Sequence, residues 1–284
     1  MSILINNLNY IYMSETPYEK TALSDINIKI NEGEFVGIIG HTGSGKSTLI
    51  QHFNGILKPT IGKVTINGLD ISKENLKEIR RQVGIVFQYP EHQLFEDTVY
   101  NDIGFGLKKL GMAREKIEEQ ILSAIELIGL DNKILHKSPF ELSGGQKRKA
   151  AIAGVIAMKP KILVLDEPAA GLDPVGREEI YNAIINYRKE NNATVILVSH
   201  NMEDLARLAQ RIIVLNEGKI EMEGTVSEIF KKSDVLEKIG LSVPQITYFM
   251  KGLKKYLPDI NDNVYTIKEA KEEILNFIKK RASI

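Results

Sequence analysis

A glycine-rich segment contains the residues of this chain that are best suited to chemistry. Residues 40–47 read Gly-His-Thr-Gly-Ser-Gly-Lys-Ser and fit the pattern G-x-x-x-x-G-K-[ST]. The glycines allow the backbone to curl so that its N–H groups converge on phosphate oxygens. Lys46 can reach the β- and γ-phosphates, and the Ser47 hydroxyl can bind Mg²⁺. The segment therefore predicts a site for a nucleotide and Mg²⁺, made by Gly40, His41, Thr42, Gly43, Ser44, Gly45, Lys46 and Ser47.

Two carboxylates at the end of an apolar run form the second candidate. Residues 161–168 read Lys-Ile-Leu-Val-Leu-Asp-Glu-Pro, which predicts a buried strand that ends at Asp166 and Glu167. Ligands of parallel α/β sheets bind at the carboxyl ends of strands. Asp166 can hold Mg²⁺ directly or through water. Glu167 can polarise a water molecule for attack on the γ-phosphate.

The third candidate is the segment Leu-Ser-Gly-Gly-Gln at residues 142–146, which precedes a small-residue helix predicted at residues 147–158. Its serine and glycines would form a helix N-terminus, which suits an anion. A single bound nucleotide does not obviously need two such helix starts. The residues that we expect to contact a nucleotide bound by a second subunit are therefore Ser143, Gly144, Gly145 and Gln146.

Strand and helix patterns alternate along most of the chain, and these elements must hold the three segments in place. Apolar runs predict strands at residues 3–12, 34–39, 64–66, 83–87, 162–165, 194–198 and 212–215. Helical periodicity predicts helices at residues 46–54, 98–110, 114–128 and 267–280. This alternation predicts an α/β fold with a mainly parallel core sheet covered by helices.

The composition excludes several classes of protein. The 284 residues carry 37 Lys plus Arg and 37 Asp plus Glu, so no net charge favours nucleic acid as a partner. The absence of cysteine excludes disulfides, thiolate metal sites and thiol catalysis. No apolar run approaches the ~20 residues that span a bilayer, and the first residues are too polar for a signal peptide. We expect a cytoplasmic chain that reaches the membrane only through partners.

The order of these motifs, with Gln88 and His200 at two further strand ends, resembles the ATPase domain of ATP-binding cassette (ABC) transporters over about residues 1–230. The resemblance implies a P-loop NTPase fold with an N-terminal antiparallel β subdomain and an inserted helical subdomain at about residues 91–160. It implies an ATPase domain at residues 1–243 and a small C-terminal extension at residues 244–284, which we expect to take part in dimerisation. The implied activity is hydrolysis of ATP, with Mg²⁺, coupled to transmembrane transport.

The resemblance also assigns roles to single residues. Gln88 matches the glutamine of the family's Q-loop, which ligates Mg²⁺ or water, and His200 matches the switch histidine, which contacts the γ-phosphate. The expected catalytic residues are accordingly Glu167, His200 and Lys46, and the expected metal ligands are Ser47, Gln88 and Asp166.

Further nucleotide contacts follow from the same resemblance. Tyr12 lies where the family places an aromatic residue against adenine, and Tyr10, on the same strand face, is the alternative. Thr48, directly after the phosphate loop, is expected to contact the nucleotide. Asp173 matches the aspartate of the D-loop, which communicates across the dimer; Ala170 stands where the family commonly has serine, so this chain lacks that hydroxyl.

Residues 83–95 read Val-Gly-Ile-Val-Phe-Gln-Tyr-Pro-Glu-His-Gln-Leu-Phe and resemble energy-coupling factor (ECF) transporter ATPases, in particular the A′ subunit. This resemblance implies a heterodimer with the A subunit (or a homodimer in isolation), a transmembrane T component, and exchangeable S components that capture vitamins or metal ions. The chain would then be peripheral, at the cytoplasmic face of the cell membrane. Three carboxylates near the Q-loop, Glu91, Asp97 and Asp102, could pair with arginines of the T component.

Other types of ABC ATPase fit less well. DNA-repair and chromosome types need long coiled-coil insertions, translation-factor types need two tandem cassettes, and this sequence has neither. A module that binds ATP without hydrolysis would not need Glu167 and His200. The alternative that stays open is the ATPase subunit of a conventional binding-protein-dependent importer, which has the same chemistry and a different membrane partner.

Overall fold

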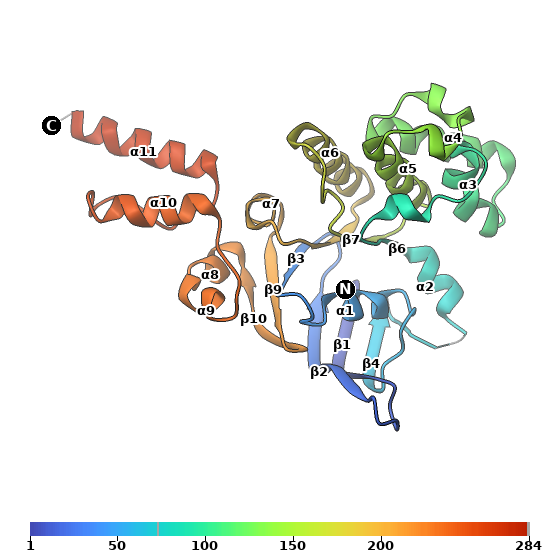
Figure 1. Cartoon of the computed structure of the whole chain (residues 1–284), viewed down its shortest axis with the longest axis horizontal. Helices are drawn as coiled ribbons and strands as arrows, with labels where there is room; N and C mark the ends of the chain where they lie inside the picture. Colours follow the sequence, from blue (N-terminus) through green and yellow to red (C-terminus); the bar gives the residue numbers. More distant parts are fainter. Residues whose placement is uncertain (73, 283–284) are drawn as a thin grey trace. The chain divides into compact units, whose positions relative to one another are not determined.

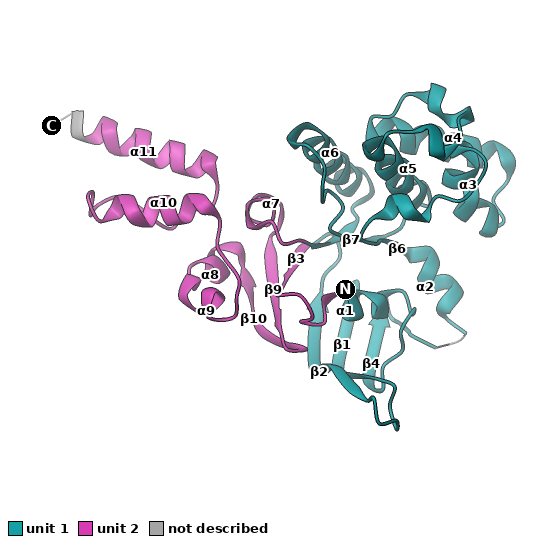
Figure 2. Ribbon diagram, in the orientation of Figure 1, with its two compact units in different colours: residues 1–34, 47–198 teal, residues 35–46, 199–284 magenta. Residues whose placement is uncertain are grey.

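The structure, a computed structural model, describes residues 1–72 and 74–282. Figure 1 shows its helices and strands, and Figure 2 shows the two compact units into which the chain divides. Unit 1 contains residues 1–34 and 47–198, and unit 2 contains residues 35–46 and 199–284. The last two residues of the predicted C-terminal extension, 283 and 284, lie outside the described residues.

An antiparallel sheet opens unit 1. Its strands are β1 (Ile3–Tyr12), β2 (Lys20–Ile30), β4 (Ile61–Ile66) and β5 (Leu69–Asp70), in the order β2-β1-β4-β5. Ile3 and Ile5 are buried at alternate positions, as expected for a sheet with one face on the core, and Leu8 is buried after a register shift that follows Ile5. The predicted antiparallel β subdomain is therefore confirmed, and β1 has the predicted bounds.

Three parallel strands form the core of unit 1. They are β6 (Val83–Val86), β7 (Ile162–Asp166) and β8 (Thr194–Val198), and every residue in them is buried. Val86 pairs with Leu165, and Asp166 pairs with Val198, with no slip in register along either ladder. Continuous apolar runs of this kind are typical of parallel strands that are covered on both faces.

The helices of unit 1 fall into two groups. The first group is α1 (Lys46–Phe53), which begins with the last residue of unit 2, α2 (Leu76–Gln82) and α6 (Pro174–Asn191). The second group, the helical part predicted from the sequence, is α3 (Val99–Lys109), α4 (Arg114–Ile128) and α5 (Gly144–Ala157), which pack against one another (Figure 1). Short 3-10 turns accompany them at Pro90–Gln93 (η1), Asn132–His136 (η2) and Pro139–Glu141 (η3). Helix α5 begins three residues before its predicted start, because Ser143 caps it.

Unit 2 contains the strand that leads into the phosphate loop. That strand, β3 (Phe35–Ile39), pairs in parallel with β9 (Arg211–Asn216), which forms an antiparallel hairpin with β10 (Lys219–Thr225). Its helices are α7 (Met202–Leu208), α8 (Val226–Phe230), α9 (Ser233–Lys238), α10 (Gln245–Lys254) and α11 (Ile267–Ala282). Among the described residues, no helix is both long and apolar enough to cross a membrane.

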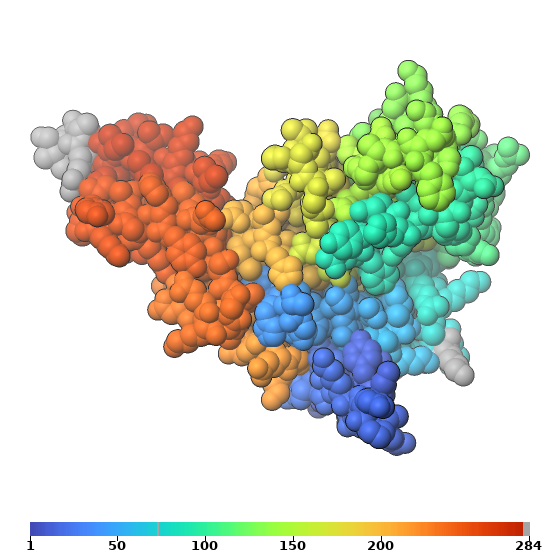
Figure 3. Space-filling view, viewed as in Figure 1, coloured from blue at the N-terminus to red at the C-terminus, as the bar shows by residue number. Residues whose placement is uncertain are grey.

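The C-terminal extension has an apolar core of its own. Met250, Ile260, Val264 and Ala270 are almost fully buried together, and Figure 3 shows α10 and α11, coloured orange to red, packed side by side. The Thr247 hydroxyl donates a hydrogen bond to the Val264 carbonyl at 2.8 Å, which fixes the segment between the helices. The sequence predicted α11 and missed α10.

Replacing Tyr187 with phenylalanine tests the packing of α6. The buried Tyr187 hydroxyl donates to the Pro160 carbonyl at 2.7 Å, just before β7. Tyr187→Phe leaves that carbonyl without its donor and is expected to lower the free energy of unfolding by about 1–3 kcal/mol. Urea denaturation measures the change, with Tyr18→Phe at an exposed tyrosine as the control. Equal stability of both variants would contradict this role.

Candidate active site

Three glycines of the phosphate loop in unit 2, Gly40, Gly43 and Gly45, have a positive φ that other residues rarely adopt. A Cβ at Gly40 would lie 2.4 Å from the Leu215 carbonyl oxygen and 2.4 Å from Ser44 Oγ. Gly45 has φ +103°, a conformation that other residues rarely adopt. The loop is therefore closely packed against β9, and the pattern read from the sequence has a steric cause.

The side chain of Lys46 is held inside this loop. Its ammonium group donates hydrogen bonds to the carbonyls of Gly40 at 2.7 Å and His41 at 2.9 Å, and the residue is only 7% exposed. A buried cation ringed by curled backbone is the arrangement that binds phosphate in P-loop proteins. The predicted role of Lys46 therefore has the required geometry.

His200 lies close enough to Lys46 to be affected by its charge. Loss of hydration lowers the pKa of His200, and the positive charge of Lys46 lowers it further. The imidazole is therefore neutral near pH 7. A neutral imidazole can donate one N–H to a phosphate oxygen without carrying a charge of its own.

In unit 1, Ser47 and Asp166 offer two oxygens to one cation. The Ser47 hydroxyl donates to Asp166 Oδ2 at 3.3 Å. Two ligands at neighbouring corners of a Mg²⁺ octahedron lie about 3 Å apart, and a hydroxyl with a carboxylate is a donor set that Mg²⁺ accepts. The described residues contain no cluster of three or more His, Cys, Asp or Glu. Such a sparse site suits Mg²⁺, which takes its remaining ligands from water and phosphate.

The two candidate adenine-stacking tyrosines differ in their exposure. Tyr12 is 38% exposed, and its hydroxyl lies 3.1 Å from Thr48 Oγ1, next to the phosphate loop. Tyr10 is partly buried and packs edge-on against both Tyr12 and His52, with ring centroids 4.8 and 5.0 Å apart. Tyr12 therefore offers the more accessible ring and stays the preferred candidate.

Gln88 and Glu167 follow neighbouring strands. Because Val86 pairs with Leu165, the two residues come next to each other along the same edge of the β6–β7 ladder. Glu167 has φ +50°, and Tyr89, directly after Gln88, has φ +56°. Left-handed backbone at residues other than glycine is costly and gathers at functional sites. The Glu167 N–H also donates to the Val198 carbonyl at 3.0 Å, which fixes the strand end.

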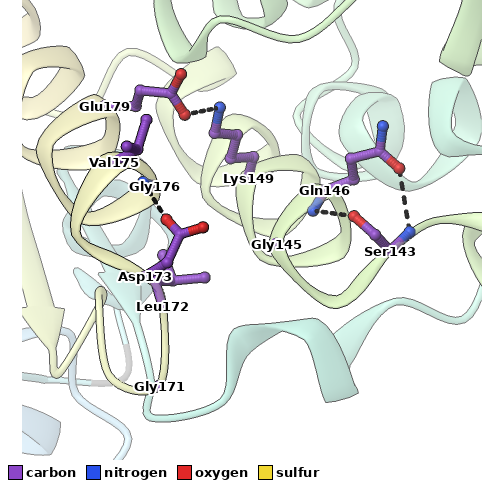
Figure 4. A pocket seen from close by; sticks show the side chains of 10 residues that line it. All are labelled: Ser143, Gly145, Gln146, Lys149, Gly171, Leu172, Asp173, Val175, Gly176 and Glu179. Atoms are coloured by element: carbon purple, nitrogen blue, oxygen red, sulfur yellow. Dashed lines mark hydrogen bonds and ion pairs between the residues drawn. The ribbon is translucent and has the colours of Figure 1, made fainter.

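Ser143 and Gln146 lock the start of α5 through two reciprocal hydrogen bonds. Gln146 N–H donates to Ser143 Oγ at 3.3 Å, and Ser143 N–H donates to Gln146 Oε1 at 3.1 Å (Figure 4). The first helical N–H groups belong to Gly144 and Gly145, and such groups have no acceptor within the helix. The predicted helix start is thus present, and its binding of an anion stays a prediction.

A second helix start faces the same cavity. Asp173 caps α6 by accepting a hydrogen bond from Gly176 N–H at 2.7 Å, and Ala170 lies in the turn before it. Figure 4 shows Asp173 and Ser143 on opposite sides of a cavity of about 440 Å³. Lys149 and Glu179, 2.7 Å apart, lie at its edge. The structure therefore brings together the predicted third motif and Asp173, which the sequence separates by almost thirty residues.

Arg148 was not among the residues predicted from the sequence. It lies on α5 inside a basic run that is typical of a solvated surface, yet it is only 4% exposed. Its guanidinium donates to both carboxylate oxygens of Glu91, at 2.6 and 2.9 Å, and to the Ala170 carbonyl. Burial opposes ionisation of Glu91, but the hydrogen bonds from Arg148 outweigh it, so the pKa of Glu91 is lowered.

Two carboxylates that were expected to face a membrane partner are used inside the chain. Glu91 is paired with Arg148, and Asp102 Oδ1 accepts the backbone N–H groups of Phe95 at 3.0 Å and Glu96 at 3.2 Å. Pairing of these two carboxylates with a membrane partner stays a prediction. Asp97 is exposed, and its role stays a prediction.

The C-terminal extension begins beside His200. Glu203 accepts a hydrogen bond from Gln245 N–H at 3.0 Å, which ties the first residue of α10 to α7. A cavity of about 220 Å³ lies there, lined by His200, Met202, Glu203, Ser242, Val243, Gln245 and Tyr248. The sequence offered no signal for this contact.

Comparisons with known proteins agree with this geometry. Residues 23–170 match the family described as ABC transporter. The chain is 60% identical to the energy-coupling factor transporter ATP-binding protein EcfA2 of Acetivibrio thermocellus, over 99% of this chain and 100% of that protein. It is 54% identical to the protein of the same name from Clostridium tetani, over 100% of this chain and 99% of that protein.

Solved structures show the same fold. CbiO1 of Clostridium perfringens, described as part of the ABC transporter complex cbiONQ, aligns with a TM-score of 0.74 and 37% identity, over 88% of this chain and 98% of that one. The ATP-binding cassette MJ0796, a dimer in a post-hydrolysis state with ADP and Pi, aligns with a TM-score of 0.72 and 31% identity, over 79% of this chain and 98% of that one.

Lys46→Ala tests the phosphate loop. The variant removes the ammonium group that would contact the β- and γ-phosphates, and hydrogen bonds to charged groups contribute about 1.5–3 kcal/mol. We expect affinity for a fluorescent ATP analogue to fall about 10- to 100-fold. Lys63→Ala, at an exposed lysine paired with Asp70, is the matched control. Tight binding by Lys46→Ala would refute the role assigned to Lys46.

Proposed function

Because this chain belongs to the ABC transporter family, and within it to the ATP-binding subunits of ECF transporters, we propose that it is the A′-type motor of an importer for vitamins or metal ions. As a member of this class it is an ATPase coupled to transport. At the level of residues, the proposal depends on the hydrogen bond between Ser47 and Asp166, because Ser47 directly follows Lys46 of the phosphate loop. A hydroxyl, a carboxylate and a buried ammonium at these positions fit ATP with Mg²⁺ and few other ligands.

In this proposal, the residues of the phosphate loop, from Gly40 to Thr48, hold the triphosphate, and Tyr12 stacks on adenine. Bound Mg²⁺, held by Ser47, Asp166 and Gln88, would neutralise phosphate charge. Glu167 accepts a proton from the attacking water while the bond between the γ-phosphorus and the bridging oxygen breaks. Neutral His200 donates a hydrogen bond to the γ-phosphate, where negative charge gathers in the transition state.

A second ATPase subunit completes each site. The start of α5, with Ser143, Gly144, Gly145 and Gln146, is proposed to cap the γ-phosphate that the other subunit binds, and Asp173 lies across the same cavity. Ser143, Gly144 and Gln146 are exposed, which supports this assignment. Closure of the pair on ATP and reopening after hydrolysis would supply the motion that drives transport.

The partners that we propose are the A-type ATPase subunit, a transmembrane T component and substrate-capturing S components. The close relatives are named as ECF transporter proteins, which supports this set over a conventional pair of permease chains. The chain would then be peripheral, at the cytoplasmic face of the membrane. Substrate choice would belong to the S components.

Glu167→Gln tests the general base. The substitution keeps the shape and the hydrogen-bonding capacity of the side chain but removes its ability to accept the proton, which typically costs about 10²–10⁴-fold in rate. We expect ATP binding to be retained and the turnover number to fall by that factor, as measured by phosphate release and by equilibrium binding on the same preparation. Hydrolysis at a near-normal rate would assign the base to another residue.

A pull-down from detergent-solubilised native membranes tests the partners. With this chain tagged, we expect a second cassette ATPase, one T-like membrane protein and several small membrane proteins to co-purify. A pair of permease chains with a soluble binding protein would favour the conventional importer. Recovery of no membrane protein would leave the ATPase activity and remove support for the transport partners.

A further inference from the structure

The buried side chain of Arg148 links three segments of unit 1: the start of α5, the segment after Gln88 and the turn after Glu167. Arg148 extends from the second turn of α5, the helix that Ser143 caps. It reaches Glu91, three residues after Gln88, and the carbonyl of Ala170, three residues after Glu167. All of these residues lie within the same compact unit.

The hydrogen bonds use the planar fork of the guanidinium. Nε donates to Glu91 Oε2 at 2.9 Å and Nη2 donates to Oε1 at 2.6 Å, which is a bidentate pair. Nη1 donates to Ala170. Lysine cannot hold both partners in this way, because its ammonium is a single point with no fixed fork. The Tyr89 ring covers the guanidinium, with 5.9 Å between Cζ and the ring centroid.

Each of the two segments that Arg148 contacts contains a residue with strained, left-handed backbone. Tyr89 directly follows Gln88, and Glu167 is the proposed general base. Tyr89 and Glu167 have φ of +56° and +50°. The Ala170 N–H donates back to the Glu167 carbonyl at 3.2 Å, so the carbonyl that Arg148 holds belongs to the turn formed by Glu167 itself. Strained residues of this kind persist only when the surrounding structure holds them in place, and Arg148 contacts both segments at once.

We propose that Arg148 is a positioning residue that holds Gln88 and Glu167 in register with each other and with the start of α5. The inference rests on the proposed ATPase function. In this proposal Arg148 acts through its hydrogen bonds to Glu91 and to the Ala170 carbonyl. When α5 moves as it caps a partner's nucleotide, the guanidinium transmits that movement to the base and to the Q-loop.

The experiment compares turnover with nucleotide affinity in the full-length chain co-purified with its partners. Arg148→Met keeps a long, unbranched side chain and removes the hydrogen bonds to Glu91 and to the Ala170 carbonyl. Since misplacement of catalytic groups by about 1 Å can cost about 10²-fold, we expect turnover to fall by about that factor while the Kd for an ATP analogue changes less than about threefold. Arg148→Lys keeps the charge without the fork and should recover only part of the loss.

A double-variant cycle separates coupling from general destabilisation. Glu91→Gln alone should lower turnover, and Glu91→Gln with Arg148→Met should be no worse than Arg148→Met alone, since both remove one interaction. Arg188→Met is the matched control, because Arg188 on α6 also donates to a loop carbonyl, that of Gly33, at 3.0 and 2.6 Å. It should lower the melting temperature and keep the turnover number.

The outcomes are distinct. A folded Arg148→Met protein with normal turnover, or additive losses in the double variant, would overturn the positioning role. If Arg148→Met fails to fold, Arg148→Lys and Glu91→Gln still decide, because normal turnover in both would overturn it as well. Absence of hydrolysis by the unaltered protein in its complex would instead contradict the proposed function.

Discussion

The parallel pairing of β6, β7 and β8 is the constraint on which the chemistry of unit 1 depends. Each strand is wholly buried, so the chain can present polar groups only where a strand ends. With Val86 opposite Leu165 and no slip in register, Gln88 and Glu167 follow at the same edge. A one-residue slip would turn every side chain of a strand to the opposite face. The burial of the strands therefore protects the geometry of groups that lie outside them.

The buried positive charges of Lys46 in unit 2 and Arg148 in unit 1 have different hydrogen-bond partners. In unit 2, the ammonium group of Lys46 donates to the carbonyls of Gly40 and His41, and its positive charge helps to lower the pKa of His200. In unit 1, the positive charge of Arg148 is matched by Glu91 and has no excess to offer an anion. A buried charge is tolerated only when it is paired and hydrogen-bonded, and this requirement explains why Glu91 turns inward.

The sequence predicted the residues whose role follows from local pattern. The bounds of β1 and α4, the phosphate loop and the capped start of α5 all depend on residues close to one another in the chain. It could not predict the partners of Arg148, because Glu91 and Ala170 are 57 and 22 residues away and a basic run usually lies in solvent. Helix α10 was missed for a related reason: its apolar residues have a partner only once α11 packs against them.

The C-terminal extension is tied to α7 at its start and packs an apolar core of its own farther along. Where α10 begins, Gln245 N–H donates to Glu203, and both residues line the cavity that also contains His200, so a substitution at either one changes the surroundings of that histidine. Farther along, Met250, Ile260, Val264 and Ala270 are buried against one another and against further apolar residues of the extension, Ile246, Leu253, Leu257, Ile274 and Phe277. The exposed side chains of α10 and α11, such as Phe249, Leu275 and Ile278, lie outside this core, so substitutions there leave its packing unchanged.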